Sequence, residues 1–160
     1  MDRPIYITPA GYGRMRAEYQ RLFEIERPAL VETISWAAGN GDRSENGDYI
    51  YGRKRLREID RTLDRLSKKL AKIQVVDPAK QPDRGRAFFG ATVTIADEDD
   101  AERVVTLVGE DEADAGAGRI SWHSPLARAL RGAAIGDLRR VMLPGGEKEY
   151  EVVGISYPDA

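Results

Sequence analysis

A heptad pattern of apolar residues between positions 44 and 73 constrains this chain more than any other feature. Its members lie alternately three and four residues apart, at Tyr49, Gly52, Leu56, Ile59, Leu63, Leu66, Leu70 and Ile73. This spacing predicts a long α-helix with one apolar stripe, whose apolar character only Gly52 breaks. Such a helix cannot bury its stripe alone, so the chain must supply a partner for it.

A second, less regular stripe lies upstream, at Tyr12, Met15, Tyr19, Leu22, Leu30, Ile34 and Ala37. Pro28 falls inside this run and is expected to interrupt and kink the helix, because proline lacks a backbone N–H and its ring clashes with the preceding turn. Gly39-Asn40-Gly41-Asp42 separates the two runs with strong turn chemistry. We therefore expect an antiparallel coiled-coil hairpin, an arm of roughly 45 Å at ~1.5 Å per residue, with its tip at residues 39–46.

The second half of the chain has a different apolar period. Pro78 and Pro82 mark a linker, and beyond them the pattern alternates with period two. Strands are expected at residues 89–95, 103–108, 139–143 and 150–155, with Pro144-Gly145-Gly146 forming a hairpin turn between the last two. Ser124-Pro125 favours the start of a short helix over 126–130. The predicted class is α+β, with a helical arm at 1–76 and a small β-sheet domain at 77–160.

Composition excludes several classes of protein. The chain has no cysteine, which rules out disulfides and thiolate metal sites. It has no apolar run of the ~20 residues that span a bilayer, and its N-terminus lacks a secretory pattern, so a cytoplasmic protein is expected. Residues 1–74 hold 15 Lys and Arg against 11 Asp and Glu, whereas residues 75–160 hold 10 against 16. The basic arm and the acidic domain are thus expected to make different contacts.

Two carboxylates lie at the expected tip, Asp42 and Glu45, three residues apart. One interpretation is a capping box, with Asp42 as the N-cap of the second helix and Glu45 at its third position. The other is metal chemistry, because Mg²⁺ binds through one or two carboxylates together with phosphates and water. Two exposed carboxylates make a poor site by themselves, so this interpretation requires a second metal and a phosphodiester supplied from outside.

A basic cluster follows the tip. Arg53, Lys54, Arg55 and Arg57 begin it, and Arg61 and Arg65 continue it at intervals of four along one side of the helix. Interspersed acidic residues are compatible with an ordinary solvated face. The alternative is a contact with RNA phosphates or with an acidic protein channel, for which Arg53, Lys54, Arg57 and Arg61 are the candidates.

The chain resembles the Gre family of transcript cleavage and elongation factors, of the GreB type. In the first half the resemblance is carried by Glu26-Arg27-Pro28, Trp36-Ala37-Ala38, Gly41-Asp42-Arg43-Ser44-Glu45-Asn46 and Lys54-Arg55-Leu56-Arg57-Glu58-Ile59-Asp60. In the second half it is carried by Phe88-Phe89-Gly90-Ala91, Val108-Gly109-Glu110-Asp111-Glu112-Ala113-Asp114, Ile120-Ser121, Ser124-Pro125-Leu126-Ala127-Arg128-Ala129-Leu130 and Pro144-Gly145-Gly146-Glu147. Arg43-Ser44 favours the GreB type.

The resemblance implies a coiled-coil arm and a C-terminal domain similar to the FKBP fold. It implies that the arm enters the secondary channel of RNA polymerase, where Asp42 and Glu45 help to hold a second Mg²⁺ that the free protein does not bind. The polymerase would then cleave the 3′ end of backtracked nascent RNA, so the chain would be a cofactor and not an enzyme. The region of Ser121, His123 and Pro125 would dock on the polymerase.

The chain departs from the family at two positions, with Gly47 in place of a more usual alanine and His123 where Asp or Asn is common. His123 is the only histidine and is interpreted as an ordinary polar loop residue. The runner-up function is a secondary-channel regulator that does not promote cleavage. A prolyl isomerase or chaperone rests on fold analogy alone, and a purely structural coiled coil does not require acids at the tip.

Overall fold

The computed structural model describes residues 4–39 and 46–159. Two compact units make up the chain, one of residues Gly13–Lys72 and one that joins Met1–Tyr12 to Ile73–Ala160. None of the helices in the described ranges is both long enough and apolar enough to cross a membrane. The expected division into separable domains at 1–76 and 77–160 stays a prediction.

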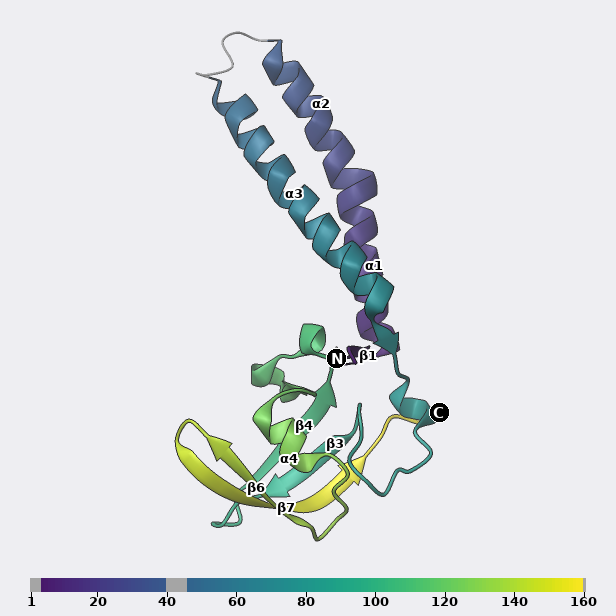
Figure 1. Cartoon of the computed structure of the whole chain (residues 1–160), viewed down its shortest axis with the longest axis vertical. Coiled ribbons are helices and arrows are strands. Elements are labelled where there is room, and N and C mark those ends of the chain that lie inside the picture. The colour runs from purple at the N-terminus through teal and green to yellow at the C-terminus, as the bar shows by residue number, and fades with distance from the viewer. Residues whose placement is uncertain (1–3, 40–45, 160) are drawn as a thin grey trace. The chain divides into compact units, whose positions relative to one another are not determined.

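The helical unit is an antiparallel hairpin. Its first arm runs through α1 (Pro9–Gln20), the π-helical segment η1 (Arg21–Glu26) and α2 (Arg27–Ala38), and its second arm is α3 (Gly47–Lys72). Helices α2 and α3 lie side by side (Figure 1). The expected stripes face inward, since the residues buried within this unit are Met15, Leu22, Ile34, Ala37, Gly52, Ile59, Leu63 and Leu66. The predicted helical hairpin is confirmed.

The expected interruption of the first helix at Pro28 is wrong, because the helix continues through this residue. The chain stays helical from Pro9 to Ala38, and the N–H of Arg27 reaches back five residues to the Leu22 carbonyl. A wider π turn before the proline relieves the clash between its ring and the preceding turn without breaking the helix.

Gly52 lies at a close contact between the two arms of the hairpin. A Cβ atom at residue 52 would lie 2.7 Å from Cγ1 of Ile34, closer than real contacts allow. Ile34 therefore packs against α3 where residue 52 has no side chain to exclude it. Gly47, by contrast, has nothing within 4 Å of its would-be Cβ.

The second unit is a five-stranded sheet in the order β5-β4-β3-β7-β6. Its strands are β3 (Thr92–Ala96), β4 (Glu102–Val108), β5 (Arg119–Ser121), β6 (Leu138–Leu143) and β7 (Gly146–Ser156). Only β4 and β5 pair in parallel. Helix α4 (Pro125–Leu130) supplies Leu126, Ala127 and Leu130 to the core. The α+β class is confirmed, with β5 as a strand that the sequence pattern did not predict.

Strand β3 begins later than the expected residue 89, for a local reason. Gly90 has a φ of +87°, which places a turn where the apolar run suggested extended chain. The ring of Pro78 lies against Gly90, in the space that a side chain at residue 90 would occupy. Pro78 is itself buried at the start of the 3-10 helix η2 (Pro78–Lys80), so the expected linker packs onto the sheet unit instead of running free.

The start of the chain belongs to the sheet unit through two contacts. Strand β1 (Tyr6–Ile7) pairs in parallel with β2 (Gln74–Val75). The carboxylate of Glu112, in the 3-10 helix η3 (Glu110–Glu112), accepts hydrogen bonds from Thr8 and from the Gly109 N–H. Glu112 is only 8% exposed, so these bonds compensate a buried charge. A second short 3-10 helix, η4 (Ala115–Ala117), leads into β5.

Candidate functional site

The tip joins the end of α2 at Ala38 to the start of α3 at Gly47. Asp42 and Glu45, the predicted metal ligands, lie outside the described residues. The residues on either side of them are described. At the end of α2, the Gly39 N–H donates to the Trp36 carbonyl at 3.1 Å. At the start of α3, the backbone N–H of Ile50 donates to the Asn46 carbonyl at 3.0 Å.

The N-cap of α3 is Asn46. Its Oδ1 accepts the N–H of Tyr49 at 3.1 Å, the bond that an N-cap makes to the third helical residue. The capping-box interpretation of Asp42 and Glu45 concerns residues outside the described part of the chain. For α3 itself, the third-residue N–H is bonded to Asn46. The same side chain also donates from Nδ2 to the Ala37 carbonyl at 2.6 Å, across the hairpin.

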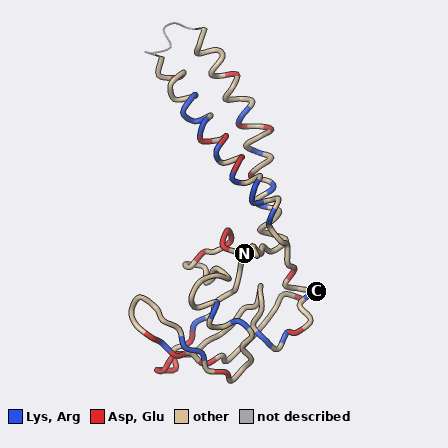
Figure 2. The backbone as a smooth tube through the Cα atoms, viewed as in Figure 1, with Lys and Arg blue, Asp and Glu red and all other residues tan. Residues whose placement is uncertain are grey.

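The predicted basic residues of α3 form one exposed row. Arg53, Lys54, Arg57 and Arg61 are all exposed, and positively charged residues gather along this helix (Figure 2). Within the described part of the chain, none of the four forms an ion pair. We call them the free basic row. Cations without partners keep their full charge for an external anion.

Arg55 belongs to a different group, although the sequence places it in the same cluster. Its guanidinium bonds to Glu26 at 2.6 Å across the hairpin and to Glu58 at 3.4 Å. Its hydrogen bond holds the pKa of the Glu26 carboxyl below the ordinary value of 4.5, and Arg21 adds to this shift. Arg27 and Asp60 make a second pair across the hairpin at 2.8 Å, which raises the pKa of Arg27. Both the Glu26–Arg55 pair and the Arg27–Asp60 pair join the two arms of the hairpin.

The predicted docking residues lie close together in the chain: Ser121 ends β5, His123 lies on the turn that follows, and Pro125 begins α4. The Ser121 Oγ accepts the His123 N–H at 3.2 Å, and Pro125 is exposed at the first turn of α4. Between them, Trp122 is buried with its ring under the Arg131 guanidinium, 4.2 Å from the ring centroid. The core thus anchors this turn while leaving its polar residues at the surface.

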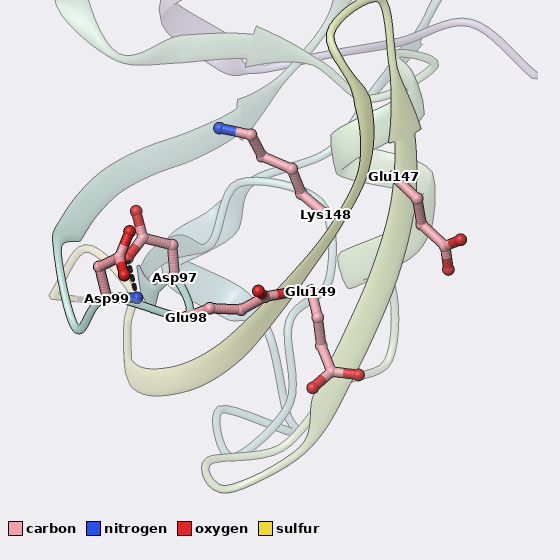
Figure 3. Close-up of a pocket in the computed structure, with 6 residues that line it drawn as sticks. All are labelled: Asp97, Glu98, Asp99, Glu147, Lys148 and Glu149. Carbon is pink, nitrogen blue, oxygen red and sulfur yellow. Dashed lines mark hydrogen bonds between the residues drawn. The ribbon is translucent and has the colours of Figure 1, made fainter.

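A shallow acidic pocket lies elsewhere on the sheet unit (Figure 3). It is lined by Asp97, Glu98, Asp99, Glu147, Lys148 and Glu149. Asp97 Oδ1 accepts the N–H groups of Asp99 and Ala101, which closes the turn between β3 and β4. No set of three or more acidic or histidine side chains within 4–39 and 46–159 has the arrangement of a metal site. This pocket therefore gives no support to a resident cation.

Two family models cover almost the whole chain. Residues 5–75 match the N-terminal model of the transcription elongation factors, and residues 81–157 match the C-terminal model of the transcription elongation factors GreA and GreB. This chain belongs to the GreA/GreB family. GreB of Neisseria meningitidis serogroup B is 47% identical over 152 residues, which cover 95% of this chain and 93% of the relative.

Further relatives agree with this family. GreB of Yersinia pestis is 43% identical over 98% of this chain and 91% of its own length, and GreA of Alkalilimnicola ehrlichii is 42% identical over 94% and 96%. Several GreB-named relatives at 43–47% identity support the GreB type. A solved GreA/GreB structure from Nitrosomonas europaea, 22% identical, covers 98% of this chain and 100% of that chain with a TM-score of 0.43.

Sequence reasoning missed three residues that shape this member of the GreA/GreB family. Asn46 carries a signal of its own, since asparagine is a preferred N-cap and stands directly before the helix. Gly52 breaks the apolar stripe in the sequence, but its lack of a side chain leaves room for Ile34 in the structure. Glu26 was not singled out, and only the fold brings it to Arg55, 29 positions away.

Proposed function

We infer that this chain acts on RNA polymerase, entering its secondary channel with the helical arm and stimulating cleavage of backtracked nascent RNA. In this way it rescues arrested elongation complexes. The observation that carries the proposal is the position of Asp42 and Glu45 in the sequence between Ala38 and Gly47, the ends of two long antiparallel helices. A narrow arm with two acids at its end can deliver negative charge into a channel that a globular protein cannot enter.

Two carboxylates fit a shared Mg²⁺ site and not a resident one. A hard cation takes about six oxygen ligands, and Asp42 and Glu45 supply too few of them. The polymerase and the RNA phosphodiester must provide the others, so the free chain is a cofactor of the polymerase and not an enzyme. When bound there, Mg²⁺ lowers the pKa of a coordinated water and stabilises the leaving oxygen. Asp42 and Glu45 contribute negative charge and oxygen ligands.

The free basic row supports a contact with the extruded RNA. Arg53, Lys54, Arg57 and Arg61 carry charges that no described carboxylate neutralises. Phosphates are the natural counter-charge for such a row, and binding them would release condensed counterions. The row begins at Arg53, seven residues after Asn46 and about two turns into α3 from the tip.

Docking is assigned to the sheet unit, at the turn that carries Ser121, His123 and Pro125. The acidic character of residues 75–160 favours a basic partner surface. In this proposal the arm acts on the RNA, and the sheet unit binds the polymerase. The predicted cytoplasmic location follows from this function.

The deciding experiment uses RNA polymerase stalled on a template and allowed to backtrack, with the nascent RNA labelled at its 5′ end. Adding the chain should shorten the RNA and produce complexes that resume elongation. The matched control is the same complex held at the forward position, where no 3′ RNA is extruded and no shortening is expected. Binding without shortening in the backtracked complex would instead support the non-cleaving regulator.

A further inference from the structure

The peptide group between Trp122 and His123 is bonded at both of its polar atoms. Its N–H, which belongs to His123, donates to the Ser121 Oγ at 3.2 Å. Its carbonyl, which belongs to Trp122, accepts a hydrogen bond from Nη2 of Arg131. The first bond is local to the turn, whereas the second comes from a residue at the C-terminal end of α4. Because a peptide group is planar, two bonds at its opposite ends fix the orientation of its plane.

Arg131 is itself placed by the helix and by the core. It is the C-cap residue of α4, and its backbone N–H donates to the Ala127 carbonyl at 3.1 Å. Its guanidinium carbon lies 4.2 Å from the centroid of the Trp122 ring, which is a cation–π contact. That ring is buried and makes a T-shaped contact with Phe89, with the ring centroids 5.8 Å apart. The planar guanidinium therefore lies flat on the core and donates to the turn from a defined position.

The Trp122 carbonyl controls how the chain leaves the sheet. The Trp122 N–H donates to the Val108 carbonyl of β4 at 2.7 Å, so the turn is fixed to the sheet on its N-terminal side. On the other side the chain continues through His123 to the exposed Pro125. Without a donor at the Trp122 carbonyl, the peptide that joins the two sides is free to rotate about its two flanking dihedral angles. The bond from Arg131 removes this freedom.

We propose that Arg131 is a positioning residue for docking on the polymerase and acts through the Trp122–His123 peptide. The docking residues Ser121, His123 and Pro125 then present one fixed surface. The proposal rests on the function inferred above, in which this turn binds the polymerase. A turn that is already ordered loses less conformational entropy on binding than a mobile one. Arg131 thus raises the affinity for polymerase without itself contacting it.

Two variants and a control separate this role from an effect of charge. Arg131→Met keeps a flexible apolar side chain for the Trp122 ring but has neither the donor nor the charge. Arg131→Gln loses the charge and keeps an amide donor. Arg103→Met is the control, because Arg103 is an exposed cation on β4, roughly 17 Å along the strand from Val108 at about 3.3 Å per residue.

The first measurement needs no polymerase. By NMR, we expect the His123 N–H of Arg131→Met to exchange with solvent about threefold faster than in the wild type, or more, because its peptide group has lost one of its two bonds. The Val152 N–H donates to the Asp137 carbonyl at 2.9 Å in the buried part of the sheet, so its exchange reports on the stability of the whole unit. The rate should rise more at His123 than at Val152, and Arg103→Met should change neither.

The second measurement titrates the chain against backtracked polymerase with RNA labelled at its 5′ end. For Arg131→Met we expect the concentration that gives half-maximal shortening to rise about threefold to tenfold, while the maximal rate stays at the wild-type value. Arg131→Gln should lie between Arg131→Met and the wild type. The ratio of half-maximal concentrations should not change with salt, because the lost bond lies within the chain and is not a charge contact across the interface.

Three results would overturn the proposal. One is an unchanged rate of exchange at the His123 N–H in Arg131→Met, and another is a wild-type half-maximal concentration for that variant. The third is an equal deficit in Arg131→Met and Arg131→Gln that disappears at high salt, which would show that Arg131 binds the polymerase directly through its charge. If the wild-type chain binds polymerase without shortening RNA, the inferred cleavage function fails, and the affinities of the variants for polymerase decide the docking role instead.

Discussion

Ile34 occupies the space in which residue 52 would carry its side chain, with Cγ1 2.7 Å from the position of a Cβ atom. This contact predicts that replacing Gly52 with alanine lowers the stability of the chain, the opposite of the usual effect in a helix. Gly→Ala inside a helix normally stabilises by up to about 1 kcal/mol. At Gly52 we expect a net loss of up to about 2 kcal/mol, because overpacking costs about 1–3 kcal/mol and outweighs the gain in helix propensity.

Gly47 is the matched control, since it lies on the same helix with open space around it. Gly47→Ala should be neutral or slightly stabilising. Thermal unfolding followed by circular dichroism measures both variants. Adding Ile34→Ala to Gly52→Ala should recover part of the loss, and an additive double variant would show that the two residues do not compete for space.

The acidic pair should act through charge. We expect Asp42→Asn and Glu45→Gln each to abolish most stimulation of RNA cleavage, because a neutral amide is a poor ligand for Mg²⁺. Both variants should fold and should compete with the wild-type chain for polymerase. The measurement is RNA shortening as a function of Mg²⁺ concentration. Normal shortening by Asp42→Asn at low Mg²⁺ would show that its carboxylate has no part in the chemistry.

The free basic row should respond to extruded RNA. We expect Arg53→Ala with Arg57→Ala to weaken binding to backtracked polymerase more than binding to polymerase without extruded RNA. The difference should shrink as salt rises, because phosphate contacts release counterions. Lys68→Ala with Lys72→Ala removes the same charge from the other end of α3 and is the control. Equal losses in both polymerase states would indicate a protein contact in place of RNA.

The Glu26–Arg55 pair should make the stability of the arm depend on pH. The pKa of Glu26 is lowered by Arg55, so its contribution is complete above the ordinary value of 4.5 and is lost as pH falls through the lower, folded value. At pH 7 we expect Glu26→Gln to melt up to about 3 °C below the wild type, a small shift because the pair is partly exposed.

That difference should shrink as the pH falls below 4.5 and through the lowered pKa of Glu26, since the wild-type carboxyl then becomes neutral as well. Asp64→Asn serves as the control, because its partner Lys68 lies on the same helix and both side chains are well exposed. A melting difference for Glu26→Gln that is the same at pH 3 and pH 7 would show that the charge of Glu26 contributes nothing.

Sequence reasoning reached the hairpin and the sheet because both follow from periodicity. The stripe at Ile59, Leu63 and Leu66 needs a partner, and the Gly39–Gly41 turn leaves only the preceding helix to provide it. The alternation of Val93 and Ile95 likewise marks a strand with one buried face. Strand β5 could not be predicted, because Arg119–Ser121 is too short to show a period. It is a strand only through its pairing with β4.

Local patterns in the sequence determined the fold class, the two stripes and the basic character of α3, because each depends on residues a few positions apart. Only the tertiary structure decided which of these side chains have a partner on the opposite helix and which have no described partner. It pairs Arg55 with Glu26 and leaves Arg53 without a described partner, although the two arginines are two residues apart. It also gives the cap of α3 to Asn46 and fills the space at Gly52 with Ile34. The physical reason is that these contacts join opposite arms, so their partners are set by how the helices pack and not by sequence spacing.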